Sequence, residues 1–205
     1  MAEILTKGGK AIAVKADLRK MTELDDIVEA TLEEFGRIDI LINNAGIFIT
    51  GIIDQTTEEE WNKTFDINVK SAYFLTQKVV PHLLRQGKGK IVFVGSIFGP
   101  IGGSGVSSYA ASKMAIHGLT VSLAIELAPS KINVNAVAPG NVDTPMNYGF
   151  YDEFGGKEAF GKQYYPIGRV GLVEDIAAAV AFLASEEADW ITGVVLPVDG
   201  GYLAK

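Results

Sequence analysis

A tyrosine and a lysine stand four residues apart in a segment that is typical of a helix. Tyr109 and Lys113 open the run YAASKMAIHGLTVSLAIELA, and a spacing of four places both side chains on one helix face, one turn apart. A cation beside a phenol stabilises the phenolate, so we expect Lys113 to lower the pKa of Tyr109 toward the working pH. The pair therefore indicates general acid/base chemistry, although a motif this short also arises by chance.

Further polar residues that suit a ligand site surround this pair. Ser96 lies 13 residues before Tyr109, between the apolar run KIVFV and the glycine-rich segment FGPIGGSG, and a serine at that one offset makes a chance combination far rarer. The run Asn43-Asn44-Ala45-Gly46 follows the apolar run IDILI, and its residue types allow a ligand to approach the carboxyl end of a parallel strand. Asn68 lies inside a predicted helix, where asparagine often serves through its side chain or marks a backbone irregularity.

Short apolar runs alternate with longer helical patterns along the chain. The apolar runs are rich in isoleucine and valine, as parallel strands covered on both faces must be, and they are 11–14, 38–42, 90–94, 132–138 and 193–198. The helical patterns cover about residues 22–36, 57–86, 107–128 and 172–185. This alternation predicts a single α/β domain over residues 1–205, with a parallel sheet of about five strands and helices on both faces.

The start of the second helical pattern carries a clear signal. Thr56 and Thr57 precede Glu59 and Glu60, so either threonine can open a capping box.

The helical pattern 107–128 is apolar or small nearly all round. In its run from Tyr109, only Lys113 and Glu126 are charged. One face can cover the sheet, and the other needs a second cover that a chain of this size has little protein to supply. We therefore expect a homo-oligomer in which a second copy covers this helix.

The segment 141–165 is the one long connection after a predicted strand. Glycines loosen it, and it holds seven aromatic residues: Tyr148, Phe150, Tyr151, Phe154, Phe160, Tyr164 and Tyr165. One interpretation is a mobile aromatic lid over an apolar substrate. The alternative is aromatic packing within an ordered loop.

The composition excludes several classes of protein. The 205 residues carry a net charge of −7 and no cysteine, which excludes a disulfide scaffold, a thiolate metal site and a cysteine nucleophile. Such an acidic chain has no excess of basic residues with which to bind nucleic acid or an anionic membrane surface. His82 and His117 stand alone, so we expect no metal site. The amino terminus lacks the apolar core of a signal peptide, and glycines interrupt the charge-free stretch 91–112, so we expect a cytoplasmic protein without a membrane span.

These motifs together resemble the short-chain dehydrogenase/reductase family, of the type that includes bacterial 3-oxoacyl-acyl-carrier-protein reductases. The match follows the order and spacing of the family's motifs along essentially the whole chain. The matching residues are Asn43–Gly46, Asn68, Ser96, Tyr109 with Lys113, Pro139 and Gly140 with Thr144, and Val198–Gly201. The resemblance implies a Rossmann-like sheet, NAD or NADP as cofactor, a small-molecule carbonyl or alcohol substrate, and a dimer or tetramer.

The resemblance also implies a role for each matching catalytic residue. Tyr109 is the general acid in carbonyl reduction and the base in alcohol oxidation, and Lys113 lowers its pKa and holds the nicotinamide ribose. Ser96 donates a hydrogen bond to the substrate oxygen. Asn68 anchors a water in a proton relay that passes through Lys113.

The resemblance further implies that a second group of residues binds the cofactor. Asn43, Ala45 and Gly46 line the path of the adenosine ribose, and Asp17 contacts the adenine. Pro139, Gly140 and Thr144 border the nicotinamide amide.

The sequence departs from the family in one respect. The family begins with a strand, a glycine-rich TGxxxGIG turn, a helix and a second strand, and Gly8-Gly9 precedes a predicted strand instead of following one. We therefore expect this chain to lack the first βαβ unit and its pyrophosphate cradle, and to bind the dinucleotide weakly. We also expect residues 10–16 to pair with residues 38–42 through a right-handed crossover and close a five-stranded sheet, or a partner chain to cover that edge.

Two other functions fit the same residues. Ser96 near Tyr109 and Lys113 is a nucleophile beside a potential base, which could cleave esters without a dinucleotide. The chain could also be a catalytically silent binding or assembly protein that keeps the scaffold.

Overall fold

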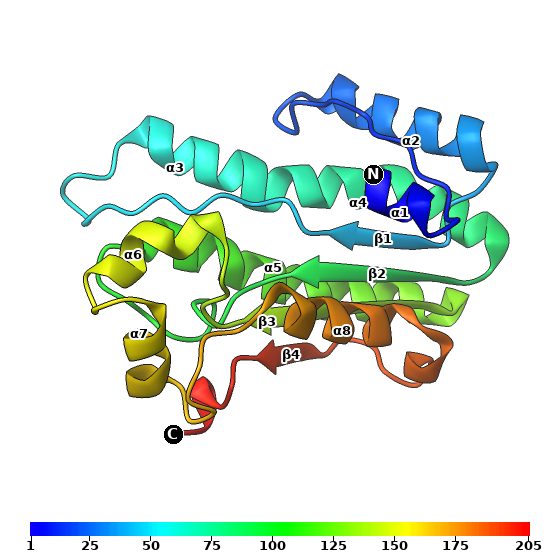
Figure 1. The fold of residues 1–205 in the computed structure, drawn as a ribbon. Helices are drawn as coiled ribbons and strands as arrows, with labels where there is room; N and C mark the ends of the chain where they lie inside the picture. Colours follow the sequence, from blue (N-terminus) through cyan, green and yellow to red (C-terminus); the bar gives the residue numbers. More distant parts are fainter.

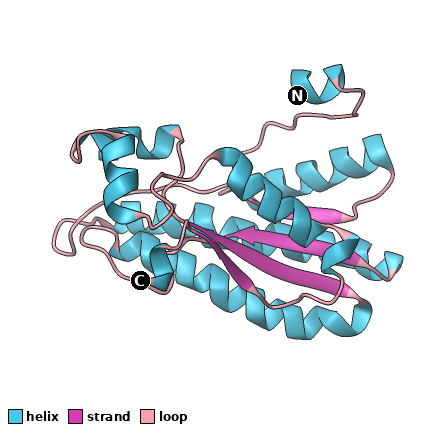
Figure 2. Ribbon diagram, turned by 60° about the horizontal axis from the view of Figure 1, so that its bottom comes forward, coloured by secondary structure: helices cyan, strands magenta, loops and turns pink.

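The structure is a computed structural model that describes residues 1–205. Its centre is a parallel sheet of four strands in the order β1-β2-β3-β4, with helices on both faces (Figures 1 and 2). The strands are β1 (Ile40–Asn43), β2 (Gly89–Val94), β3 (Ile132–Pro139) and β4 (Val195–Val198). The predicted Rossmann-like parallel sheet is confirmed.

The longer helices lie where the sequence patterns predict them. They are α2 (Met21–Phe35), α3 (Glu58–Phe65), α4 (Ser71–Gln86), α5 (Ser107–Leu127) and α8 (Val173–Ala184). Shorter helices are α1 (Ala2–Thr6), α6 (Tyr148–Asp152) and α7 (Lys157–Tyr164). No helix has an apolar stretch long enough to cross a bilayer.

The two faces of the sheet carry separate cores. On β2, the buried Ile91 and Phe93 belong to the main core, which α4 and α5 contribute to. Between them, Val92 points the other way and packs in a second core with Leu183 of α8. This alternation follows from the period of two along a strand, and it explains why β2 is apolar at every position from Ile91 to Val94.

The long helical pattern at 57–86 is interrupted in the structure. A π-helical turn, Asp66–Lys70, separates α3 from α4 and has Asn68 at its centre. Such turns are rare and frequently occur at functional sites. The irregularity that the mid-helix asparagine predicts is therefore present.

The prediction of a fifth strand, at the amino-terminal end of the chain, is wrong. Residues 10–16 pair with no other segment, and Ile12 and Val14 are each 37% exposed. Helix α2 follows this segment and packs against α4 instead of crossing to the sheet, so the chain before it stands away from β1 (Figure 2). The sheet has four strands, and β1 pairs only with β2.

The segment after β3 forms α6 and α7 and a small aromatic core. Tyr151, Phe160, Tyr165 and Val170 are buried together, and Phe154, Tyr164 and Tyr202 pack against them. Of the two interpretations of this segment, aromatic packing accounts for most of these rings. Phe150 differs because it also lines the large cavity described below.

The capping box at the start of α3 generates a prediction about stability. Thr57 Oγ1 accepts a hydrogen bond from the Glu60 backbone N–H at 3.2 Å, and the Glu60 carboxylate accepts one from the Thr57 N–H at 2.9 Å. Thr57→Ala should lower the free energy of unfolding by about 1 kcal/mol, measured by urea denaturation. Thr56→Ala is the control, because Thr56 Oγ1 donates only to the Ile52 carbonyl outside the helix. Equal losses at both positions would contradict the assignment of Thr57 as the cap.

Candidate active site

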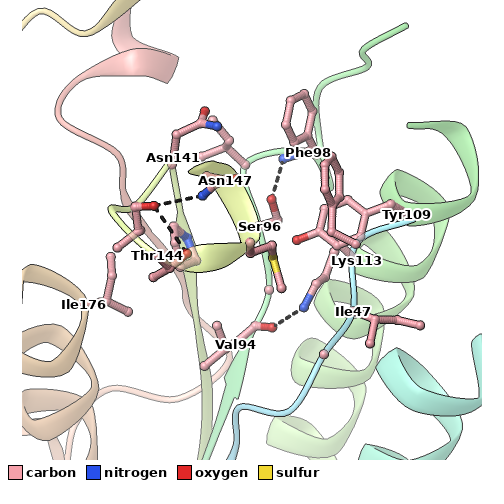
Figure 3. A pocket seen from close by; sticks show the side chains of 18 of the residues that line it. Ile47, Val94, Ser96, Phe98, Tyr109, Lys113, Asn141, Thr144, Asn147 and Ile176 are labelled. Carbon is pink, nitrogen blue, oxygen red and sulfur yellow. Dashed lines mark hydrogen bonds between the residues drawn. The ribbon is translucent and has the colours of Figure 1, made fainter. Parts of the chain in front are cut away.

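The carboxyl ends of the strands open on one large cavity of about 1010 Å³. Its walls come from the segments that follow β1, β2 and β3, from the first turns of α5 and from one side of α8 (Figure 3). Ligands of open parallel sheets bind at this edge, where successive strand ends converge. The sheet topology therefore determines where the cavity lies, and the segments after the strands contribute polar side chains to its lining.

Ser96 and Tyr109 both line this cavity. Ser96 follows the end of β2 by two residues, and its loop is tied to β3 by hydrogen bonds from Gly95 N–H to the Val137 carbonyl at 2.8 Å and from Ile97 N–H to the Pro139 carbonyl at 3.1 Å. Tyr109 lies in the first turn of α5 and is 9% exposed. Figure 3 shows both hydroxyl groups directed into the same space.

The Ser96 hydroxyl has a defined orientation. Its Oγ accepts a hydrogen bond from the Phe98 N–H at 3.1 Å. Because a serine hydroxyl has one O–H donor besides its acceptor lone pairs, its proton can be donated to the neighbouring Tyr109 oxygen or, when a ligand is bound, to a ligand oxygen in the cavity.

Lys113 is buried one helical turn beyond Tyr109. Its Nζ donates a hydrogen bond to the Val94 carbonyl at 2.8 Å and lies 5.6 Å from the centroid of the Tyr109 ring. Burial lowers the pKa of Lys113 to about 8. Two of its three N–H donors have no acceptor within the protein and suit ligand oxygens in the cavity.

The pKa of Tyr109 moves opposite to the direction predicted from the spacing. Burial raises the pKa of the phenol, and only a hydrogen bond with Ser96 opposes that rise. Lys113 Nζ, which donates to the Val94 carbonyl and lies 5.6 Å from the centroid of the Tyr109 ring, does not reverse that rise. The spacing correctly predicted proximity, but it took no account of desolvation.

Asn68 uses its whole side chain to hold the segment after β1. Its Oδ1 accepts a hydrogen bond from the Ile47 N–H at 2.8 Å, and its Nδ2 donates to the Ile47 carbonyl at 3.0 Å and to Ser112 Oγ at 3.1 Å. Asn68 thereby connects the π-helical turn, the β1 loop and α5. The water-anchoring role implied by the resemblance stays a prediction.

The cofactor-binding residues implied by the resemblance divide into two groups. Ala45, Gly46, Pro139, Gly140 and Thr144 line the cavity together with Tyr109 and Lys113. A Cβ at position 46 would lie 3.3 Å from Asn68 Oδ1 and 3.4 Å from Lys113 Nζ. The glycine therefore leaves the Lys113 ammonium open to the cavity on this side.

Asp17 and Asn43 lie outside the cavity lining. Asp17 is paired with Arg19 through two hydrogen bonds, of 2.9 and 2.7 Å, and this pairing lowers the pKa of its carboxyl group. Asn43 donates to Thr76 Oγ1 at 3.0 Å, which ties β1 to α4. Their adenosine-binding roles stay predictions. No group of three or more histidines, aspartates or glutamates is arranged to hold a metal ion.

The apolar wall from α8 is the part of the site that the sequence did not indicate. On α8, Val173, Ile176, Ala177 and Val180 face the cavity with the spacing of one helical stripe. Met146 and Phe150 add to it from the segment after β3. An apolar stripe in a sequence does not distinguish a pocket wall from a helix face that covers a sheet.

Comparisons with known proteins agree with this arrangement. A family model described as enoyl-(acyl carrier protein) reductase matches residues 1–203. The 3-oxoacyl-[acyl-carrier-protein] reductase FabG of Thermotoga maritima is 38% identical over 193 residues, which are 94% of this chain and 77% of that protein. The FabG of Staphylococcus epidermidis is 39% identical over 199 residues, or 97% of this chain and 80% of that protein.

Solved structures give the same result. A crystal structure described as a short-chain alcohol dehydrogenase, from Sinorhizobium meliloti, has a TM-score of 0.94 and 34% identity. The match covers 100% of this chain and 81% of the Sinorhizobium meliloti chain. The structure of ElxO with NADP bound has a TM-score of 0.86 and 34% identity, and the match covers 92% of this chain and 77% of the ElxO chain.

The burial of Lys113 generates a prediction about pH and stability. Its folded pKa of about 8 lies below the ordinary value of 10.5, so between these values the unfolded chain binds more protons, and this residue makes stability rise with pH by up to about 1.4 kcal/mol per unit. Lys113→Met should remove that rise between pH 8 and 10, measured by urea denaturation. Lys88→Met, at an exposed lysine, is the control. An unchanged pH dependence in Lys113→Met would contradict the prediction.

Proposed function

The chain belongs to the short-chain dehydrogenase/reductase family of oxidoreductases, and we propose that it transfers a hydride between NADP(H) or NAD(H) and a small carbonyl or alcohol substrate. The convergence of Tyr109, Lys113 and Ser96 in one cavity at the strand ends supports this proposal. The binding of NADP by ElxO supports the choice of a nicotinamide dinucleotide.

The proton chemistry belongs to Tyr109 and Ser96. In reduction, the Tyr109 hydroxyl donates its proton to the carbonyl oxygen, and in oxidation the phenolate takes that proton back. Ser96 donates its O–H to the same oxygen and stabilises the negative charge that develops there. The raised pKa of Tyr109 keeps the phenol protonated near neutral pH, which is the form that reduction needs.

The dinucleotide, when bound, supplies the hydride for reduction or accepts it in oxidation. Lys113 would hold its ribose through the two free N–H donors, beside the space that Gly46 leaves open. Pro139 and Thr144 would border the nicotinamide from the opposite wall. No TGxxxGIG turn lies within residues 1–205, so none of the residues named above is a ligand of the diphosphate.

The cavity lining favours an apolar carbonyl compound as substrate. Lys113 is the only charged residue among those that line it, and apolar side chains form its outer wall. A hydrophobic wall recognises alkyl or aryl groups by burial and has no partner for a charged substituent.

The two alternative functions have no support. The matching relatives are named reductases. The potential bases beside Ser96 are Tyr109 and Lys113. Burial raises the pKa of Tyr109, which keeps the phenol protonated, and Lys113 Nζ donates its hydrogen bond to the Val94 carbonyl and makes none with Ser96, so neither group acts as a base that would activate the serine for ester cleavage.

We further propose that the protein is a homo-oligomer through α5. Met114, Val121 and Ile125 are 53%, 47% and 75% exposed and lie on one side of this helix. Tyr73 and Leu84 of α4 add two more exposed apolar side chains nearby in the same layer. A second copy of the same surface would bury this stripe symmetrically.

The assignment of Tyr109 as the proton donor predicts how turnover changes when the Tyr109 hydroxyl is removed. Tyr109→Phe removes the proton donor and keeps the ring that packs edge-on against Phe48 at 4.7 Å. We expect turnover of a ketone with NADPH to fall by at least about 100-fold with the unfolding midpoint unchanged. Tyr148→Phe, at an exposed tyrosine outside the cavity lining, is the matched control. Turnover that survives in Tyr109→Phe would remove this residue from the mechanism.

The oligomer proposal predicts a change of mass in solution. Val121→Glu and Ile125→Glu place carboxylates on the stripe and should convert the oligomer to monomers, measured by light scattering after size-exclusion chromatography. Ile4→Glu on α1 introduces the same charge at another exposed isoleucine and should leave the mass unchanged. A monomeric wild-type chain would refute the proposal.

A further inference from the structure

One buried histidine beside the site has no hydrogen-bond partner. Nε2 of His117 is the only buried side-chain nitrogen or oxygen in the structure without one. His117 lies one helical turn beyond Lys113, so Tyr109, Lys113 and His117 follow one another along one face of α5. The reaction proposed above uses the first two residues and leaves the third unexplained.

The imidazole fills a space between the two glycines that flank Ser96. An ideal Cβ on Gly95 would lie 2.5 Å from His117 Nε2, and one on Gly99 would lie 2.4 Å from His117 Cε1. At Gly99, the three nearest atoms all belong to the imidazole ring. The ring therefore packs directly against the backbone of the loop at both ends of the segment that carries Ser96.

We propose that His117 is the positioning residue for Ser96: its neutral imidazole, wedged between Gly95 and Gly99, holds the Ser96 loop at the distance from α5 that sets the Ser96 hydroxyl beside Tyr109. The proposal rests on the proposed function, because it assigns the purpose of the loop geometry to substrate binding by Ser96. His117 does not line the cavity, so it acts through the loop and touches no substrate.

The surroundings of the ring favour its neutral form. The loop residues 94–99 and the neighbouring Val137 of β3 carry no titratable side chain, and Lys113 is the charged group that acts on His117 from its own helix. Burial and the Lys113 charge both lower the pKa of His117. Protonation would add a buried cation whose Nε2–H has no acceptor, which is unfavourable. Acid should therefore loosen the loop.

A double-mutant cycle between His117 and Gly99 tests the contact. Gly99→Ala forces a methyl group against the ring, and we expect it to lower kcat by at least about tenfold in the wild-type background. His117→Ala removes the ring, lowers kcat itself and makes room for that methyl group. In this background, Gly99→Ala should change kcat by less than about twofold. The Kd for NADPH should stay within about threefold throughout, because the cofactor residues are untouched.

Gly102→Ala is the matched control in the same loop. Its Cβ would meet no atom within 4 Å, so it should change kcat by the same factor in both His117 backgrounds. If His117→Ala fails to fold, His117→Val provides a smaller apolar side chain for the same cycle. Additive effects of His117 and Gly99 on kcat would overturn the proposal.

The pH profile separates positioning from simple packing. His117→Leu keeps an apolar group of similar bulk that binds no proton. We expect kcat of the wild type to decline as the pH falls below the ordinary histidine pKa of 6.5, and His117→Leu should lose that decline. A purely structural histidine would move the unfolding midpoint and leave the shape of this profile unchanged, which would overturn the proposal.

Hydrogen exchange keeps the proposal independent of the reaction. The amides of Ile97, Gly99 and Ile101 are hydrogen-bonded to Pro139, Ser96 and Ile97 carbonyls, and His117→Ala should speed their exchange at least about tenfold. A wild-type protein that reduces no carbonyl compound would refute the proposed function, whereas unchanged exchange in His117→Ala would refute the positioning of the loop.

Discussion

The hydrogen bond from Lys113 to the Val94 carbonyl joins the reactive end of α5 to the end of β2. Ser96 follows Val94 by two residues, and Tyr109 precedes Lys113 by one helical turn, so this one contact sets the two hydroxyl groups relative to each other. Asn68 extends the same connection to the β1 loop through Ile47 and to α5 through Ser112. The site is therefore held by hydrogen bonds from the side chains of Lys113 and Asn68 to the backbone at the end of β2 and in the β1 loop.

Burial acts on the two titratable groups of the site in the same sense, toward the uncharged form. It raises the pKa of Tyr109 and lowers the pKa of Lys113 to about 8. A phenol that keeps its proton is ready to donate it to a carbonyl oxygen, whereas alcohol oxidation requires the phenolate. The folded pocket thus favours the reductive direction near neutral pH, and the oxidative direction gains as the pH rises.

Much of the fold could be predicted from the sequence, because four of the apolar runs are strands and the mid-helix Asn68 lies in a π-helical turn. Residues 11–14 show the limit. Their apolar composition suits a strand, but pairing depends on where α2 packs, which is a tertiary property that no local pattern contains. The meeting of Tyr109, Lys113 and Ser96 in one cavity was predictable because tyrosine, lysine and serine are distinctive at fixed offsets. The apolar wall from α8 was not predictable, because the same valine and isoleucine residues are found on a helix face that covers a sheet and on one that lines a cavity. The direction of the Tyr109 pKa needed the degree of burial, which spacing does not determine.

The aromatic core of α6 and α7 has a consequence for binding in the cavity. Phe150 contacts Phe154 and Phe160 at ring-centroid distances of 5.0 and 5.3 Å, and these rings pack in turn against Tyr164. Because these rings pack on one another, displacing Phe150 alone would break its contacts with Phe154 and Phe160, so the aromatic core of α6 and α7 holds this wall of the cavity in place. A ligand that packs against Phe150 therefore meets a wall that is already ordered, and its binding involves little loss of conformational entropy in this segment.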